Sequence, residues 1–117
     1  MAATILIVDD EEFIVDLLAT LLEDEGYRVL RAFNGEEALR YLERERPALL
    51  LTDNMMPRMS GMELVQYLQA NPHLAVPVIM MSAVLLTPPP PLSVIFVRKP
   101  FDLDRLLAMI ETQIATA

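Results

Sequence analysis

Residues 4–12 read TILIVDDEE, an apolar run that ends in four acidic side chains. The apolar part, residues 4–8, has the composition of a β-strand that is covered on both faces. Beyond the acidic residues, apolar side chains recur at the spacing of one helical stripe: Phe13, Ile14, Leu17, Leu18, Leu21 and Leu22. We expect this stripe to be buried and Gly26 to end the helix. A buried strand followed by an amphipathic helix is the first half of a β-α-β unit.

The rest of the chain repeats this alternation. Further strands are predicted at residues 27–32, 48–52, 76–81 and 94–97, and further helices at residues 34–44, 61–70 and 102–114. Asn34 followed by Glu37 has the spacing of a capping box and marks the start of the second helix. Strands that alternate with helices predict an α/β fold, a doubly wound parallel sheet with helices on both faces. No repeat or boundary divides residues 1–117, so we expect a single domain.

The composition limits what such a domain can do. Its 117 residues suffice for one core, 54% of them are hydrophobic and the mean hydropathy is +0.37, which excludes a disordered chain. Nine Lys plus Arg against 17 Asp plus Glu give a net charge of −8, so direct contact with nucleic acid or an anionic membrane is not expected. Cysteine is absent, which removes disulfides, thiolate metal sites and cysteine nucleophiles.

One uncharged stretch, residues 74–97, is long enough to cross a bilayer. Pro77 and the four prolines at residues 88–91 exclude a continuous helix there, because each proline removes a backbone donor. The start of the chain, MAATILIVDD, lacks the charged region and the apolar run of a signal peptide. We therefore expect a cytoplasmic protein without a membrane span.

Polar side chains stand where the predicted strands end. Asp9 and Asp10 follow the first strand, Asp53 follows the third, Ser82 the fourth and Lys99 the fifth. The carboxyl ends of parallel strands share one edge of a doubly wound sheet, where ligands bind. These five residues, distant in sequence, are therefore expected to converge on one site.

The chemistry of that site follows from the residue types. Three close carboxylates repel one another unless a cation lies between them, and oxygen ligands without His or Cys favour a hard ion, Mg²⁺ or Mn²⁺. With the ion bound, one carboxylate is free to act as a nucleophile toward phosphorus. Lys99 is the only lysine in the chain, and its ammonium can pair with a phosphoryl oxygen while Ser82 donates to another. The residues predict a metal-dependent carboxylate that accepts a phosphoryl group.

Four segments at these positions, ILIVDDEE, LLLTDNMMPRMSGMEL, VIMMSA and FVRKPF, resemble the response-regulator receiver domain of two-component signalling. The resemblance implies a flavodoxin-like sheet with strand order 2-1-3-4-5. It implies that Asp53 is phosphorylated by a sensor histidine kinase or a phosphotransfer protein. It also implies that Asp10, Asp53 and the backbone carbonyl of Met55 bind Mg²⁺ directly and that Asp9 holds a metal-bound water.

The same resemblance assigns the remaining residues. Ser82 corresponds to the switch hydroxyl that turns toward the phosphoryl group, and Lys99 to the lysine that contacts it. Phe96 takes the place of the switch aromatic that moves inward with Ser82, but as phenylalanine it has no hydroxyl to hold it outward. The Lys99–Pro100 bond is expected to be cis.

The chain departs from the family pattern between the fourth and fifth strands, where a helix is usual. Residues 83–93 read AVLLTPPPPLS; the connection is about five residues shorter than the pattern, and its prolines exclude a regular helix. Eleven residues at about 3.1 Å each still span roughly 30 Å as polyproline II, so a crossover is feasible. The fourth helix is thus expected to be missing or degraded. Its loss is expected to expose parts of the strands together with Val84, Leu85, Leu86 and Leu92.

We expect a non-enzymatic phosphoacceptor switch, either a stand-alone receiver or a piece of a longer protein. The exposed face around residues 83–93, the fifth strand and the last helix is expected to support a homodimer or a docked partner. An alternative keeps the fold without the chemistry, as an interaction module that phosphorylation no longer controls. A third interpretation, a haloacid-dehalogenase-like phosphatase, is disfavoured because Met55 stands where that class needs a second Asp.

Overall fold

The computed structural model of the chain describes residues 2–84, 90–91 and 93–116. Five strands form one parallel sheet in the order β2-β1-β3-β4-β5. The strands are β1 Thr4–Val8, β2 Arg28–Ala32, β3 Leu49–Asp53, β4 Val78–Ser82 and β5 Val94–Arg98. The helices are α1 Glu12–Asp24, α2 Gly35–Glu45, α3 Gly61–Ala70 and α4 Leu103–Thr116, with a 3-10 turn, η1, at Pro72–Leu74. The predicted α/β class and strand order are confirmed.

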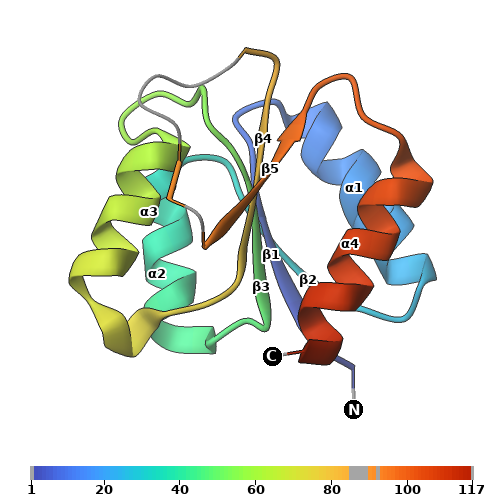
Figure 1. The fold of residues 1–117 in the computed structure, drawn as a ribbon, viewed down its shortest axis with the longest axis horizontal. Coiled ribbons are helices and arrows are strands. Elements are labelled where there is room, and N and C mark those ends of the chain that lie inside the picture. Colours follow the sequence, from blue (N-terminus) through green and yellow to red (C-terminus); the bar gives the residue numbers. More distant parts are fainter. Residues whose placement is uncertain (1, 85–89, 92, 117) are drawn as a thin grey trace.

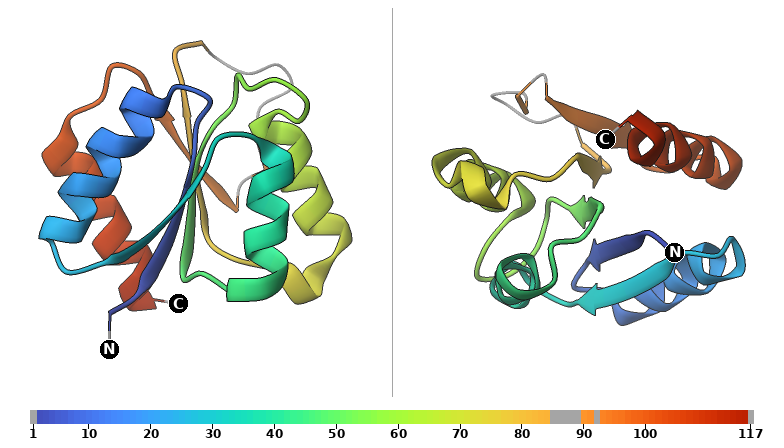
Figure 2. Two further views of the ribbon diagram at one scale, coloured as in Figure 1. Left: turned by 180° about the vertical axis from the view of Figure 1, so that it is seen from behind. Right: turned by 90° about the horizontal axis from the view of Figure 1, so that it is seen from below.

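The helices cover the sheet in two layers. Figure 1 shows α1 and α4 on one face and α2 and α3 on the other, and Figure 2 shows β2 at an outer edge of the sheet. Side chains of β1 alternate between the two layers: Ile5 and Ile7 pack under α1 and α4, whereas Leu6 and Val8 pack under α2 and α3. All four are fully buried, as the unbroken apolar run predicts for a strand covered on both faces.

Local signals set the helix boundaries. Gly26 follows α1 with φ +94°, a conformation that costs glycine nothing. The side chain of Asn34 accepts a hydrogen bond from the Glu37 backbone N–H at 2.9 Å and so caps α2 as predicted. The strands begin or end within one or two residues of the predicted positions, which is usual because strand ends lack a capping signal of this kind.

The predicted burial of α1 is wrong for two residues. Val15, Leu18, Ala19 and Leu22 form its buried face, while the side chains of Phe13 and Leu17 are 75% and 42% exposed. The apolar positions of this helix cover a wider arc than the sheet and α4 can bury. Phe13 and Leu17 lie one turn apart and leave an apolar strip on the surface.

The connection from β4 to β5 contains no helix in its described residues, 83–84, 90–91 and 93. Val84 is 54% exposed, as predicted, whereas Leu85, Leu86 and Leu92 lie outside the described residues. The expected exposure of the strands is wrong for β4. Its side chains on this face, Val78 and Met80, are buried because they pack in one cluster with α3 and with Leu74 of η1. Phe96 of β5 is half-buried.

The uncharged stretch at residues 74–97 supplies β4 and β5 rather than one long helix. Within the described ranges, no helix combines the length and the apolar character that crossing a membrane requires. The apolar residues of this stretch therefore belong largely to two strands of the sheet.

Candidate functional site

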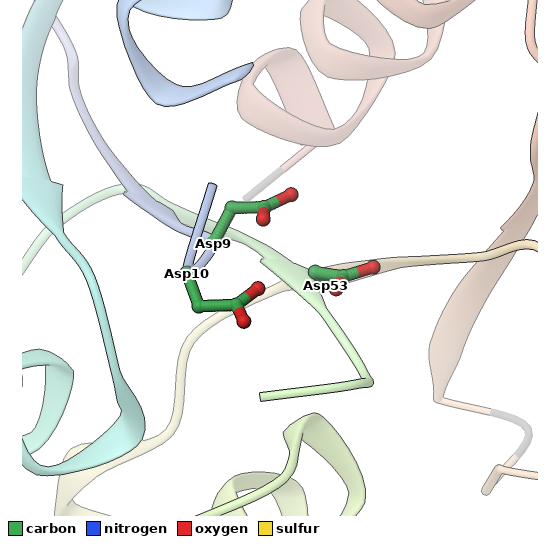
Figure 3. Close-up of side chains that lie close together, drawn as sticks. All are labelled: Asp9, Asp10 and Asp53. Carbon is green, nitrogen blue, oxygen red and sulfur yellow. The ribbon is translucent and has the colours of Figure 1, made fainter. Parts of the chain in front are cut away.

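The acidic residues that follow β1 and end β3 come together at the carboxyl edge of the sheet. Figure 3 shows the side chains of Asp9, Asp10 and Asp53 extending to the same side of the strands. One oxygen from each carboxylate lies within 4.8 Å of the others. Asp9 and Asp53 are buried and Asp10 is exposed, so the cluster opens toward solvent on the Asp10 side. The predicted convergence of these three residues is confirmed.

Lys99 completes the cluster from the end of β5. Its Nζ lies 3.0 Å from Asp53 Oδ1 and 3.7 Å from Asp9 Oδ2. The backbone N–H of Lys99 donates to the Ser82 carbonyl at 2.8 Å, and the Lys99–Pro100 bond is cis, as expected. Burial alone lowers the pKa of Lys99, but the hydrogen bond to Asp53 and the charges of Asp53 and Asp9 outweigh it and raise the pKa. The ammonium is therefore charged at neutral pH.

The surroundings of Asp9 disfavour the ionised form of its carboxyl group. Its Oδ1 accepts a hydrogen bond from the Glu11 backbone N–H at 2.9 Å, but its buried Oδ2 has no hydrogen-bond partner among the described residues. The pKa of Asp9 is raised from 3.8 to about 6, mainly by burial and also by the charge of Asp53, against the hydrogen bond from Glu11 and the charge of Lys99, which lower it. Lys99 is therefore not enough to stabilise the ionised form of this carboxylate.

These observations fit a hard divalent cation. The donor set consists of three carboxylates without His or Cys, which suits Mg²⁺ or Mn²⁺. Asp9 Oδ2, which accepts no hydrogen bond from the described residues, gives an independent reason, because a metal-bound water would satisfy such an oxygen. The exposed Asp10 leaves the solvent side of the cluster open for water and for a phosphate.

The loop after β3 holds Asp53 in place through residues that the sequence reasoning missed. The side-chain oxygen of Asn54 accepts from the Met62 backbone N–H at 3.0 Å, and its carbonyl accepts from Gly61 N–H at 3.0 Å. A Cβ on Gly61 would lie 2.5 Å from the Asp53 carbonyl oxygen, so only glycine allows this approach. Ser60 and Glu63 form a capping box at the start of α3, and their S-x-x-E spacing was a readable signal.

Ser82 and Phe96 lie near the site without a direct contact to Asp53 among the interactions found in the described residues. Ser82 is fully buried at the end of β4, and its Oγ accepts a hydrogen bond from the Val84 backbone N–H at 3.2 Å. Phe96 lines a hollow of about 250 Å³ between β5 and α4. The side chain of Met55, two residues after Asp53, is 67% exposed.

A doubly wound sheet with an acidic triad and one lysine at its carboxyl edge defines the class of phosphoacceptor switch domains. The model of the response regulator receiver domain family matches residues 5–86, and the chain belongs to that family. It is 45% identical to the Bacillus subtilis alkaline phosphatase synthesis transcriptional regulatory protein PhoP over 83 residues, 71% of this chain and 34% of PhoP. It is 36% identical to the nitrogen assimilation regulatory protein NtrX of Azorhizobium caulinodans, over 99% of this chain and 27% of NtrX. The chain thus spans about a third of the length of PhoP and about a quarter of that of NtrX.

Solved receiver domains share the fold over nearly the whole chain. The receiver domain of a Francisella response regulator superposes with a TM-score of 0.87 at 25% identity, covering 97% of this chain and 98% of that one. The response regulator TrrA of Thermotoga maritima, solved in complex with Mg²⁺ and BeF, gives a TM-score of 0.82 at 31% identity, covering 97% of this chain and 99% of that one. The acidic triad of this chain is of the kind that binds Mg²⁺ in the family.

Proposed function

We propose that Asp53 accepts a phosphoryl group from a histidine kinase or a phosphotransfer protein and thereby switches the domain between two signalling states. The observation that carries the proposal is the placement of Lys99 Nζ 3.0 Å from Asp53 Oδ1, beside two further carboxylates within 4.8 Å. Asp53 is thus the carboxylate of the triad that lies closer to the ammonium, since Asp9 Oδ2 is 3.7 Å from the same Nζ. A cytoplasmic location, where a kinase can reach the domain, is part of the same proposal.

The transfer is a simple displacement at phosphorus. One carboxylate oxygen of Asp53 forms the new P–O bond as the P–N bond to the donor histidine breaks, and the imidazole nitrogen keeps the electron pair and takes up a proton. When bound to Asp10, Asp53 and the Met55 carbonyl, Mg²⁺ neutralises charge on the phosphoryl oxygens. Lys99 exchanges its contact with the carboxylate for one with a phosphoryl oxygen.

We propose that the side chains of Ser82 and Phe96 change position when Asp53 is phosphorylated. The Ser82 hydroxyl accepts from Val84 N–H in the present state, and a turn toward the phosphoryl group frees that N–H and the connection that follows it. Phe96 is only half-buried on β5, the strand at the edge of the sheet, so its ring is not locked in the core. The signal would then reach the connection at residues 83–93 and the face of β5 and α4.

The test is labelling with a small phosphodonor such as phosphoramidate in the presence of Mg²⁺. The wild-type chain is expected to gain one acid-labile phosphate and Asp53→Asn none, while Asp24→Asn, a matched change at the exposed end of α1, labels normally. Labelling of Asp53→Asn at the wild-type level would refute the assignment. Absence of labelling in the wild-type chain would favour the alternative, an interaction module that phosphorylation does not control.

We also propose that the partner of the switched state is a second copy of this chain, bound through the face of β5, α4 and the β4–β5 connection. Exposed Val84 and the hollow of about 370 Å³ along Ile95, Ala108 and Met109 give this face apolar surface for an interface. Sedimentation equilibrium with Mg²⁺ and beryllofluoride is expected to show dimers, and Ile95→Asp to abolish them. A monomer at every concentration would contradict the dimer and leave the assignment of Asp53 standing.

A further inference from the structure

A groove of about 430 Å³, whose lining is separate from the acidic triad, lies between the outer edge of the sheet and α2. Its walls are the end of β2 with the residue that follows, Arg31 and Phe33, and one stripe of α2 that runs from Glu37 to Glu45. Eight residues along a helix cover about 12 Å. The volume falls within the range of small-molecule sites, and no residue of the groove belongs to the triad or to its loop.

Three arginines line the groove, although the protein as a whole is acidic. The net charge of the chain is −8, yet five of its eight arginines lie between residues 28 and 46. Both glutamates of the groove are already engaged: Glu37 Oε1 accepts from the Phe33 backbone N–H at 2.7 Å, and Glu45 Oε1 pairs with Arg28 at 3.1 Å. Arg28 offsets the charge of Glu45, whereas Glu37 is bound to an uncharged backbone amide and keeps its negative charge in the groove.

The three arginines of the groove differ: Arg31 is ion-paired, whereas Arg40 and Arg44 are exposed. Arg31 is held by two carboxylates of α1, at 2.8 Å and 3.3 Å. Arg40 and Arg44 are four residues apart on one face of α2, are exposed, and form no ion pair within the described part of the chain. Glu36, one turn before Arg40, pairs instead with Arg58 at 3.7 Å. Two guanidinium groups are thus left to bind an anion.

Two aromatic side chains complete the groove. Tyr41 lies between Arg40 and Arg44 in sequence, and Tyr41 and Phe33 are both half-buried and packed against the core, so their rings are held in place. A guanidinium binds phosphate through two parallel hydrogen bonds, and a fixed ring offers a surface for a planar heterocycle. A polyanion such as RNA is disfavoured by the charge of −8, and a groove about 12 Å long suits a single nucleotide.

We propose that this groove binds a nucleoside diphosphate, with its base against Tyr41 or Phe33 and its phosphates at Arg40 and Arg44. Occupancy of this second site would follow the nucleotide concentration and would not require phosphorylation of Asp53. The binding is noncovalent and depends on salt, because two exposed arginines carry the phosphate contacts.

The test is calorimetric titration with ADP and GDP in EDTA, so that metal-dependent binding at the acidic triad does not contribute. At least one of the two is expected to bind, while adenosine, guanosine and pyrophosphate each bind at least tenfold more weakly. Arg40→Ala and Arg44→Ala are each expected to weaken binding about tenfold. Arg105→Ala, which removes one exposed helical arginine on α4, serves as the matched control and changes affinity less than twofold.

A second variant tests whether binding needs the planar shape of the guanidinium groups in addition to their charge. Arg40→Lys with Arg44→Lys keeps the net charge and the helix, and is expected to lose most of the affinity because an ammonium lacks the planar fork. Three results would overturn the proposal: no binding of either nucleotide, binding that survives loss of both arginines, or pyrophosphate that binds as tightly as the nucleotide. Amide chemical shifts that move at residues 31–45 would support it, and shifts confined to the triad would overturn it.

Discussion

The burial of Asp9 predicts that the metal-free domain becomes more stable when this carboxylate is removed. We expect Asp9→Asn to raise the free energy of unfolding in EDTA at pH 8, although the residue belongs to the candidate metal site. The reason is that the native state holds an ionised Asp9 whose buried Oδ2 accepts no hydrogen bond from the part of the chain that the structure describes. Asparagine fills the same volume and carries no charge.

The magnitude follows from the pKa of Asp9, raised from 3.8 to about 6. A difference of about two pKa units corresponds to about 3 kcal/mol. Because the native state binds the proton more tightly than the unfolded state, stability decreases as pH rises from 4 to 6, and the full cost applies above about pH 7. The advantage of Asp9→Asn is therefore expected to reach about 3 kcal/mol at pH 8 and to shrink to about half of that at pH 5.

Urea denaturation at the two pH values measures both numbers, and comparison with wild type at each pH cancels the titration of the other groups. Asp10→Asn is the matched control: Asp10 is exposed, so its substitution is expected to change stability by less than about 0.5 kcal/mol. Adding Mg²⁺ is expected to stabilise the wild type more than Asp9→Asn. A variant no more stable than wild type at pH 8, or an advantage that does not depend on pH, would refute the electrostatic reading of Asp9.

Three further predictions concern the site and the fold. Lys99→Met is expected to slow labelling of Asp53 by a small phosphodonor at least about tenfold while Mg²⁺ binding, followed by stabilisation against urea, persists; an unchanged rate would show that the ammonium 3.0 Å from Asp53 is not used in the transfer. Gly61→Ala, whose Cβ would lie 2.5 Å from the Asp53 carbonyl, is expected to cost about 1–3 kcal/mol in urea denaturation and to impair labelling. Gly26→Ala, at φ +94° with open space around it, is the comparison and is expected to cost only about 1 kcal/mol and to label normally. Phe13→Ser at the exposed start of α1 is expected to change stability by less than about 0.5 kcal/mol, whereas Leu18→Ala costs about 2–5 kcal/mol; similar costs for the two would contradict the burial pattern of α1.

The site was predictable from the sequence to the extent that strand ends determine it. Asp9, Asp53 and Lys99 each follow an apolar strand, and the parallel topology alone brings those ends to one edge. What the sequence does not contain is the difference between neighbours: Asp9 is fully buried and Asp10 exposed, although both follow β1. That difference depends on which way the chain turns into α1, which is a property of packing.

The apolar patterns identified the helices but predicted less well which of their residues are buried. In α1, apolar spacing identified the helix but assigned Phe13 to the core, because periodicity gives the direction of a stripe and not the width of the surface that covers it. Asn54 was missed because its role depends on contacts eight residues away, with the first turn of α3, and no short pattern in the chain marks them.

The connection between β4 and β5, which contains no helix in its described residues, does not set the position of Lys99. Each of the five residues of β5 pairs with one of β4, from Val94 opposite Val78 to Arg98 opposite Ser82. The next backbone N–H, that of Lys99, donates to the Ser82 carbonyl. The position of the lysine is therefore fixed by strand pairing, whatever conformation joins the two strands. The match to the family ends at residue 86, shortly before the proline run, and β5 and Lys99 lie beyond it. A change in the crossover between the strands is therefore expected to leave the geometry of Asp53 and Lys99 intact as long as β4 and β5 stay paired.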